Sequence, residues 1–292
     1  STDMLFSPFK LFNAISKVRT YVLIQRASGP DTGICAFYAR MKNVKFIYSV
    51  ENDSELVGKS VASHHPVYRH IYNYGVKKAD IIVVQSHDQL SCLARINEKL
   101  TGDSFVISNS IEVRSPPAGK REHILWIARA QSWKRPEVFI KLANEMKDES
   151  FVMIMPVDKK TAETQSLVEQ ASSLDNLQLI PSVDFNLSQQ YFDKAKLLVN
   201  TSSWEGFPNT FLQAGIAATP IVSLEVDPDS FINEYSCGYV CNGDFSNLVK
   251  RVSQLLKDNK DWQKASQNCY EYVKKKHDIQ NNIKQWKKLI RG

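Results

Sequence analysis

Two stretches of this sequence place cations, a carboxylate and a glycine where strand patterns give way to helix patterns. In the first stretch, residues 126–136, Arg129 and Lys134 follow a predicted strand. A guanidinium binds phosphate through two parallel hydrogen bonds, and an ammonium binds it as a point charge. The pair could therefore hold a diphosphate. An ordinary surface loop with two cations is the alternative for these two residues taken alone.

The second stretch, residues 200–215, offers Glu205, Gly206, Asn209, Thr210 and Gln213. Asn209 and Thr210 would open a helix, whose first N–H groups and partial positive charge favour a bound phosphate. Gly206 allows a close backbone approach. Glu205 can accept hydrogen bonds from sugar hydroxyls, and Gln213 can serve a ribose. A buried amphipathic helix after a turn is the alternative, but it does not explain Glu205 and Gly206 at the strand end.

The elements that must position these residues alternate along the chain. Short apolar runs predict strands at 21–25, 45–50, 79–85, 104–108, 123–128, 151–157, 177–183, 197–201 and 220–226. Helical patterns lie at 36–42, 68–78, 88–99, 135–148, 160–173, 188–195, 208–218, 245–257 and 261–290. Apolar strands separated by helices predict parallel sheets covered on both faces, with ligands beyond the carboxyl ends of the strands.

A polar, proline- and glycine-containing run at 112–120 predicts a linker between two Rossmann-like domains that face a cleft. We expect a first domain over 1–115, a second over 116–275 and an amphipathic C-terminal helix over 276–292. Ile279, Ile283, Trp286 and Ile290 form the apolar stripe of that helix. The stripe either packs back on the first domain or docks on a membrane surface.

Composition and missing motifs exclude several classes. Of 292 residues, 43% are hydrophobic and 23% charged, which is typical of a globular protein. No apolar run approaches the roughly 20 residues of a membrane span, and no signal peptide is visible, so we expect a cytoplasmic protein. The dinucleotide, P-loop, zincin and serine-hydrolase motifs are absent. The five scattered cysteines predict reduced thiols, and we expect no metal and no cofactor.

Charge is distributed unevenly around a net charge of +6. Residues 1–115 carry 14 Lys/Arg and 10 Asp/Glu, residues 116–249 carry 11 and 17, and residues 250–292 carry 12 and 4. The basic ends favour contact with anionic ligands or with the headgroups on the inner face of a membrane. Nucleic acid is not an expected partner, because no basic motif is interleaved with aromatic residues.

Several motifs in combination resemble the retaining GT-B glycosyltransferases of family 4, the glycosyl transferases group 1. The stretch Glu205-Gly-Phe-Pro-Asn-Thr-Phe-Leu-Gln213, followed by Ala218-Thr-Pro-Ile-Val222, is similar to the family's donor-site element. Upstream, Arg129 and Lys134 match its diphosphate-binding pair. In the first domain, the runs 72–80, 84–89 and 106–109 match further family patterns.

The resemblance implies transfer of a sugar from a nucleotide-diphosphate sugar to an acceptor hydroxyl with retention and without a metal ion. Acceptors in the family are often glycans or lipid-linked glycans, which implies a role in polysaccharide or glycolipid synthesis. The family often places a histidine or an acid against the sugar or acceptor at the position of Asp53. A cap on the following helix is the alternative for Asp53. His64 and His65 are expected to be surface histidines.

The chain departs from the family pattern at Gln213, where the second acid is an amide, and at Ala128, which replaces a glycine. Judged against a domain of usual size, about 70 to 90 residues at the start of the first domain are absent, so we expect an incomplete domain and a chain without full activity. A degenerate GT-B module that binds a nucleotide sugar without turnover is therefore the rival hypothesis. A sugar-nucleotide epimerase of the same fold is a further alternative. The sugar, the nucleotide and the acceptor stay open.

Overall fold

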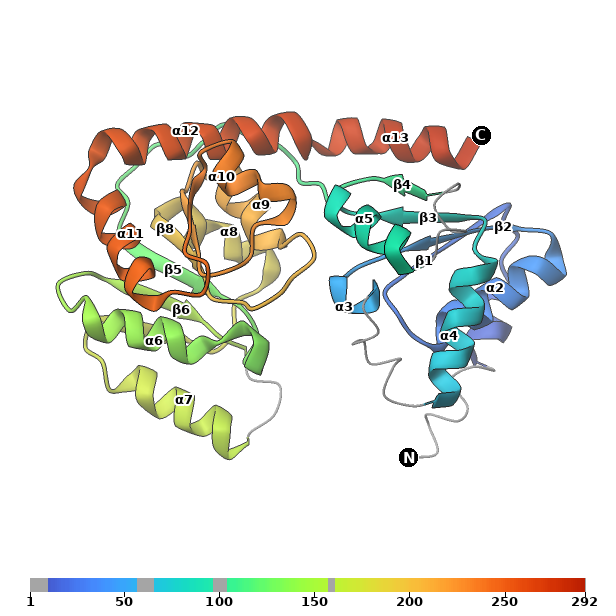
Figure 1. Cartoon of the computed structure of the whole chain (residues 1–292), viewed down its shortest axis with the longest axis horizontal. Helices are drawn as coiled ribbons and strands as arrows, with labels where there is room; N and C mark the ends of the chain where they lie inside the picture. Colours follow the sequence, from blue (N-terminus) through green and yellow to red (C-terminus); the bar gives the residue numbers. More distant parts are fainter. Residues whose placement is uncertain (1–9, 57–65, 97–103, 157–160, 292) are drawn as a thin grey trace. The chain divides into compact units, whose positions relative to one another are not determined.

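The chain folds into two compact units, each built on one parallel β-sheet (Figure 1). The structure is a computed structural model that describes residues 10–56, 66–96, 104–156 and 161–291. Unit 1 comprises Ser1–Asn109 with Asn282–Gly292, and unit 2 comprises Ser110–Asn281. The prediction of an α/β protein with two Rossmann-like parallel sheets is confirmed.

Unit 1 contains a four-stranded sheet in the order β1-β2-β3-β4, with all described pairings parallel. Its strands are β1 (Val22–Arg26), β2 (Lys45–Ser49), β3 (Ile81–Val84) and β4 (Ser104–Val106). Its helices are α2 (Pro30–Lys42), α3 (Asp53–Leu56), α4 (Pro66–Lys78) and α5 (His87–Ile96), besides a helical stretch at 10–16. Each connection between these strands therefore crosses over through helix, as parallel pairing requires.

Alternate residues of β2 point to opposite faces of the unit 1 sheet. Phe46 and Tyr48 belong to one apolar cluster, with α2 and α5 residues, whereas Ile47 belongs to a second cluster on the other face. Trp286 and Leu289 of α13 (Ile279–Arg291) pack against that second cluster. Both faces of the sheet are thus covered, which explains why its strands are continuously apolar.

The side of the C-terminal helix α13 that packs on the unit 1 sheet differs from the apolar stripe expected from the sequence. Asn282, Trp286 and Leu289 are the residues turned toward unit 1, and Asn282 Nδ2 donates to the carbonyl oxygen of Ser108 at 2.5 Å. Ile283 and Ile290, two residues of the expected apolar stripe, remain 38% and 39% exposed and are not members of that apolar cluster. The buried positions keep helical spacings of four and three, but the stripe is centred one position away.

Unit 2 contains a six-stranded parallel sheet in the order β10-β9-β8-β5-β6-β7. Its strands are β5 (His123–Ile127), β6 (Phe151–Ile154), β7 (Leu177–Ile180), β8 (Ala195–Asn200), β9 (Ile221–Ser223) and β10 (Gly238–Val240). Its helices are η3 (Ser132–Lys134), α6 (Pro136–Glu145), α7 (Ala162–Ser172), α8 (Phe185–Lys194), α9 (Asn209–Ile216), η4 (Pro228–Ser230), α10 (Phe231–Glu234), α11 (Phe245–Lys257) and α12 (Asn259–Lys276). Strand β10 and the short helices η4 and α10 have no counterpart in the sequence prediction.

The sheet of unit 2 is also buried on both faces. Along β5, Ile124 and Trp126 enter the apolar cluster that includes α6, α7 and α11 residues, and Leu125 enters the opposite cluster with α9 and α12 residues. This burial fixes the strand register, because a slip of one residue would exchange the two faces. The loops that leave the carboxyl ends of β5 and β8 are therefore held at defined positions.

The single helix expected at 261–290 is instead two helices, α12 and α13, which meet at His277 and Asp278. Ile111 explains the break, because its N–H donates to His277 O (2.9 Å) and its carbonyl accepts from the N–H of Ile279 (3.1 Å). Asp278 Oδ1 accepts from the N–H of Gln280 at 2.9 Å and so supports the start of α13. A long-range backbone pairing of this kind leaves no local sequence signal.

The pairing of Ile111 with Asp278 also affects where the two units of the chain meet. Residues 112–120 form neither helix nor strand, as expected for a connecting segment. The boundaries between the two compact units fall at residues 109 and 281, a few residues from those expected at 115 and 275. Ile111 pairs with Asp278, so both residues belong to unit 2. The ranges as functional domains stay predictions. Within the described residues, no helix is long and apolar enough to span a membrane.

Candidate functional site

The two stretches with candidate chemistry leave the sheet of unit 2 side by side. Strands β5 and β8 are parallel neighbours, with Ile124 opposite Leu197 and Leu125 opposite Leu198. Residues 128–135 follow β5, and residues 201–208 follow β8. Because parallel strands end at the same edge, both loops lie at the carboxyl edge of the sheet.

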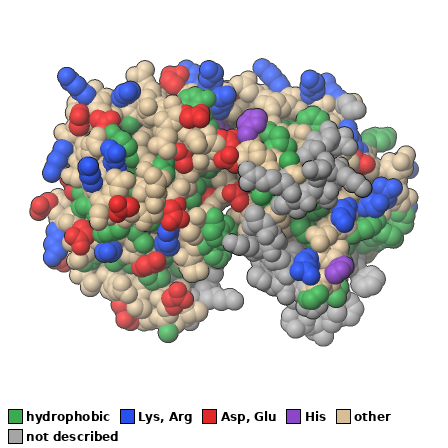
Figure 2. All heavy atoms as spheres, viewed as in Figure 1, with side chains coloured by type: hydrophobic (Ala, Val, Ile, Leu, Met, Phe, Trp, Pro, Cys, Tyr) green, Lys and Arg blue, Asp and Glu red, His purple; other side chains and the backbone are tan. Residues whose placement is uncertain are grey.

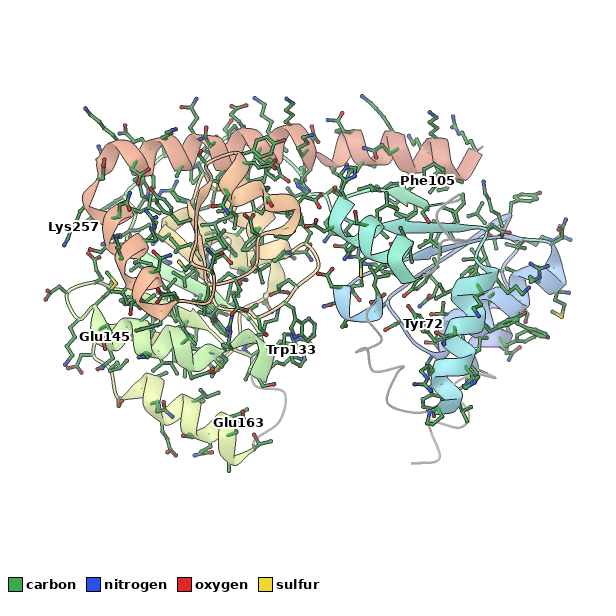
Figure 3. All side chains as sticks on the ribbon, in the orientation of Figure 1. Tyr72, Phe105, Trp133, Glu145, Glu163 and Lys257 are labelled. Atoms are coloured by element: carbon green, nitrogen blue, oxygen red, sulfur yellow. The ribbon has the colours of Figure 1, made fainter. Side chains whose placement is uncertain are left out.

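Backbone and ring contacts join the two loops. The N–H of Ser203 donates to Trp133 O at 2.8 Å, and Thr201 Oγ1 donates to Lys134 O at 2.6 Å. The rings of Trp133 and Trp204 stack with centroids 5.1 Å apart and an interplanar angle of 14° (Trp133 is labelled in Figure 3). The stretch after β8 is thus held against η3, which carries Lys134.

Lys134 and Glu205 form an ion pair at this edge, through Lys134 Nζ and Glu205 Oε1. Ser202 Oγ donates to the same carboxylate oxygen at 2.7 Å. The Lys134 and Glu205 side chains are only 17% and 12% exposed, so the pair is partly shielded from water. The structure therefore brings together an ammonium and a carboxylate that the sequence analysis assigned to diphosphate and sugar, respectively.

Arg135 is a positioning residue that the sequence analysis missed. Its backbone adopts the left-handed conformation (φ 48°, ψ 54°) between η3 and α6. The guanidinium donates to Thr201 O (2.5 Å) and Ser202 O (2.9 Å), and to Glu225 Oε1 (3.0 Å). Arg135 thereby links the loop after β8 to the segment that carries Lys134. The only sequence signal is an arginine between Lys134 and the proline that opens α6.

Arg129 lies in the same loop after β5 and is exposed. Its carbonyl accepts from the N–H of Gln131 at 2.8 Å, which tightens the turn before η3. The structure thus places Arg129 and Lys134 on one loop of the carboxyl edge. The assignment of Arg129 to a diphosphate stays a prediction.

Helix α9 begins directly after the Glu205 loop. Phe207 anchors the turn: its ring is buried against Phe231 (centroids 5.3 Å apart) and His277 (4.5 Å). Gly206 is buried, whereas Asn209, the first helical residue, is exposed. Asn209 and Thr210 form the first turn of α9, where the partial positive charge of a helix is concentrated. The α9 N-terminus therefore follows Glu205 closely in sequence and lies at the same edge of the sheet.

Gln213 is placed differently from a solvent-facing ligand. The side chain is 8% exposed, and its Nε2 donates to Ser188 Oγ of α8 at 2.9 Å. Gln189 Nε2 in turn donates to the backbone carbonyl of Gln213 at 3.1 Å. Gln213 thus joins α9 to α8 in this structure, and its role toward a ribose stays a prediction.

In unit 1, Asp53 opens α3 beyond the carboxyl end of β2. Its Oδ1 accepts from Gln89 Nε2 at 2.8 Å, and Gln89 Oε1 accepts from the N–H of Gln85 at 2.8 Å. The capping contact at this helix is made by Asn52, whose Oδ1 accepts from the N–H of Ser54 at 3.0 Å. His64 and His65 lie outside the described residues.

A buried acid next to this loop was not found from the sequence. Glu55 Oε2 accepts from Tyr48 Oη at 2.5 Å and from the N–H of Glu51 at 3.2 Å, and the hydroxyls of Tyr48 and Tyr72 are 3.1 Å apart (Figure 3 labels Tyr72). Burial raises the pKa of Glu55, although the bond from Tyr48 opposes this, and burial raises the pKa of Tyr72 to about 12. The cluster fixes the loop that carries Asp53.

A family model described as "Glycosyl transferases group 1" matches residues 108–276, more than half of the chain. The chain belongs to the glycosyl transferases group 1 family. The matched span includes Arg129, Lys134, Glu205 and Gln213, and does not include Asp53. No curated protein sequence matches the chain significantly.

Solved structures extend the likeness of this group 1 protein to both units. A variant of TarM from S. aureus, in complex with fondaparinux, α-GlcNAc-glycerol and UDP, superposes with a TM-score of 0.77 at 18% identity, over 97% of this chain and 58% of that one. HepE from Anabaena in complex with UDP-glucose gives 0.80 at 12%, over 97% and 81%. The pneumococcal O-GlcNAc transferase GtfA in complex with UDP and GlcNAc gives 0.70 at 15%, over 88% and 54%.

These likenesses show the GT-B fold for this group 1 protein. The chain spans less than two thirds of the TarM and GtfA chains it matches. Among the residues described here, no three His, Cys, Asp or Glu side chains gather as metal ligands would. The candidate site consists of the Lys134–Glu205 pair, Arg129 and the α9 N-terminus, and their roles stay predictions.

Proposed function

We propose that this group 1 protein transfers a glycosyl group from a nucleotide-diphosphate sugar to an acceptor hydroxyl with retention at the anomeric carbon. The observation that carries the proposal is the Lys134–Glu205 ion pair at the carboxyl edge of the unit 2 sheet. Family membership supports it, and so do the UDP complexes of TarM, HepE and GtfA.

In this proposal the diphosphate binds to Lys134, to Arg129 and to the first N–H groups of α9, at Asn209 and Thr210. Gly206 leaves room for the backbone to approach the phosphates. The incoming diphosphate displaces the Glu205 carboxylate from the Lys134 ammonium, because both are anions that compete for one cation. The carboxylate is then free to accept hydrogen bonds from the hydroxyls of the sugar.

The chemical step breaks the bond between the anomeric carbon and the diphosphate oxygen and forms a bond between that carbon and the acceptor oxygen, while the hydroxyl proton of the acceptor passes to the departing diphosphate. Negative charge develops on the departing diphosphate, so cations and helix N–H groups already in place lower the barrier. Asp53 is proposed to contact the sugar or the acceptor, held in place by Gln89. The acceptor is proposed to be a glycan or a lipid-linked glycan of cell-surface polysaccharide or glycolipid synthesis.

The first experiment is a thermal-shift screen of UDP, GDP, ADP and TDP and their common sugar conjugates. Wild type is compared with Arg129→Ala and with Arg114→Ala, which removes an arginine of unit 2 paired with Asp193. We expect one nucleotide to stabilise wild type and Arg114→Ala and to lose its effect on Arg129→Ala. Equal shifts for all three proteins would reject the assigned diphosphate site. The anomeric configuration of the product, read by NMR, tests retention.

A nucleotide-sugar-binding module without turnover is the second candidate, and Gln213 favours it. The amide lacks the charge of the family's acid and is engaged with Ser188. This candidate predicts donor binding with neither transfer nor slow donor hydrolysis. Gln213→Glu separates the two hypotheses: if the amide has abolished turnover, the carboxylate restores hydrolysis of the bound donor, whereas an active wild type needs no such repair.

A further inference from the structure

An apolar groove lies on the surface of unit 1, away from the residues assigned to catalysis. Its volume is about 670 Å³, and its lining comprises Phe12, Gly33, Ile34, Phe37, His70, Ile71 and Tyr74. These residues come from the helical stretch at 10–16, from α2 and from α4. We call this feature the α2–α4 groove.

Two glycines bring the backbones of α2 and α4 close together beneath the groove. A Cβ on Gly33 would lie 2.3 Å from Ile71 O, and a Cβ on Gly75 would lie 2.5 Å from the carbonyl carbon of Thr32. The close crossing sets Ile34 and Phe37 of α2 beside Ile71 and Tyr74 of α4 as the walls. The groove is thus a built consequence of helix packing.

Large apolar side chains stand exposed along the two helices. Phe37 and Met41 of α2 are 55% and 50% exposed, and Val67 and Tyr74 of α4 are 55% and 38% exposed. Ile34, Phe37 and Met41 recur at spacings of three and four, as do Val67, Ile71 and Tyr74. Each helix therefore presents an apolar stripe on the same side as the groove.

Basic residues border these stripes. Arg40 and Lys42 end α2, and Lys77 and Lys78 end α4. Lys78 continues the stripe of Tyr74 one turn later. The two helices carry a single acid, Asp31. Figure 2 shows green hydrophobic and blue Lys and Arg side chains intermixed over this part of unit 1.

We propose that the face of α2 and α4 that carries the α2–α4 groove docks on the surface of an anionic phospholipid bilayer. The exposed apolar stripes enter the boundary between headgroups and acyl chains, and the lysines and arginines at the helix ends bind the headgroup phosphates. A second copy of the chain is disfavoured as the occupant, because both copies of this face would carry net positive charge, whereas anionic headgroups complement it. The proposal goes beyond glycosyl transfer and does not depend on donor binding.

The charge arm of the test measures flotation with vesicles of phosphatidylcholine alone and with phosphatidylglycerol added. We expect binding to the anionic vesicles only, and less of it at high salt. Lys77→Gln with Lys78→Gln lowers the partition coefficient on the order of 20-fold, since each basic residue near the surface contributes about fivefold. Lys275→Gln with Lys276→Gln, an exposed lysine pair in the last turn of α12, leaves it unchanged.

A third pair, Lys287→Gln with Lys288→Gln on α13, tests the C-terminal helix as the docking element. A loss confined to the α13 pair would overturn the proposal in favour of that helix. Absence of binding of wild type to anionic vesicles would overturn it outright. Neither result touches the donor site, which the nucleotide thermal-shift screen reads separately.

The apolar arm uses Phe37→Ser with Met41→Ser, against Leu187→Ser on α8, where Leu187 is 54% exposed. We expect the α2 double variant to lose vesicle binding and the α8 variant to keep it, with thermal unfolding confirming that both are folded. Size-exclusion chromatography provides the last readout. A wild-type dimer that the α2 double variant converts to monomer would identify the face as a contact between copies and overturn the proposal.

Discussion

Lys134 and Glu205, 71 residues apart in the sequence, form an ion pair at the carboxyl edge of the unit 2 sheet. The pair joins the loop after β5 to the loop after β8, and Arg135 reinforces the junction through the carbonyl oxygens of Thr201 and Ser202. Glu205 neutralises Lys134 before any ligand arrives. When an anionic ligand replaces the carboxylate, the ammonium therefore exchanges one anion for another, and little water has to be displaced from around it.

Lys134→Met is expected to lower both donor affinity and transfer. The side chain keeps its length but loses the ammonium that would hold the diphosphate, and the rate falls on the order of 10²-fold. Titration calorimetry with the nucleotide found in the screen, together with steady-state transfer rates, measures the two losses.

Lys196→Met is the matched control for Lys134→Met. Lys196 Nζ is paired with Glu149 Oε2 at 2.6 Å, but it lies near the start of β8, at the amino edge of the same sheet. Both substitutions remove one partner of a partly buried ion pair, so both lower the melting temperature. Equal donor affinity in the two variants would contradict the assignment of Lys134.

Glu205→Gln should separate binding of the nucleotide from turnover of the sugar. The amide can still accept from Ser202 Oγ but no longer neutralises Lys134. Affinity for the nucleoside diphosphate without sugar therefore stays equal or rises, whereas transfer falls on the order of 10²-fold. A parallel loss of nucleotide affinity and transfer would show that Glu205 only supports the loop.

Much of the candidate site in unit 2 could be predicted because its signals are local. The apolar strand before Arg129 and the one before Glu205 identify two loops, and parallel pairing places both loops at one edge of the sheet. The pairing partner of a strand is not local, but a β-α-β alternation leaves few arrangements. That reasoning located Lys134 and Glu205 without showing that they touch.

The features that the sequence analysis missed depend on contacts between residues distant in sequence, or on which of two adjacent residues makes a contact. Arg135, rather than Lys134, donates to the backbone of the loop after β8, and its left-handed conformation has no signal in the sequence. Glu55 looks like any surface acid until Tyr48 and Tyr72 surround it. The break at His277 depends on Ile111, which lies more than 160 residues earlier.

Gly75→Ala is expected to destabilise unit 1 by about 1–3 kcal/mol or more through overpacking. The added methyl would meet the backbone of Thr32 and Gly33 at 2.5–2.6 Å, and backbone atoms cannot swing aside as a side chain can. Gly29→Ala is the control, because a Cβ there has its nearest neighbour, the N of Asp31, at 3.9 Å, and the backbone is extended (φ 179°). Urea unfolding measures both, and equal midpoints would contradict the close crossing of α2 and α4.

Asp227→Asn tests a half-buried acid in unit 2. The Asp227 carboxylate accepts from the N–H of Ile232 at 2.7 Å and from Asn233 Nδ2 at 3.0 Å, ahead of α10. Burial raises its pKa from an ordinary 3.8 to about 6, against the lowering effect of the bond from Ile232. Between those values the folded chain holds a proton that the unfolded chain has lost. Unfolding free energy therefore falls as pH rises through this window, and the loss is complete above about pH 6.

The amide that replaces Asp227 carries no titrating proton and can still accept from the N–H of Ile232. The melting temperature of Asp227→Asn minus that of wild type should therefore grow from pH 4.5 to pH 7. Allowing for partial exposure of the carboxyl, the gain is about 1–2 kcal/mol, or on the order of 4 °C for a unit of this size. Glu55, whose pKa is also raised, contributes equally to both proteins and cancels in the difference. A difference that stays constant across this range would mean that Asp227 is ionised in the folded chain at pH 4.5 and that its burial does not hold a proton.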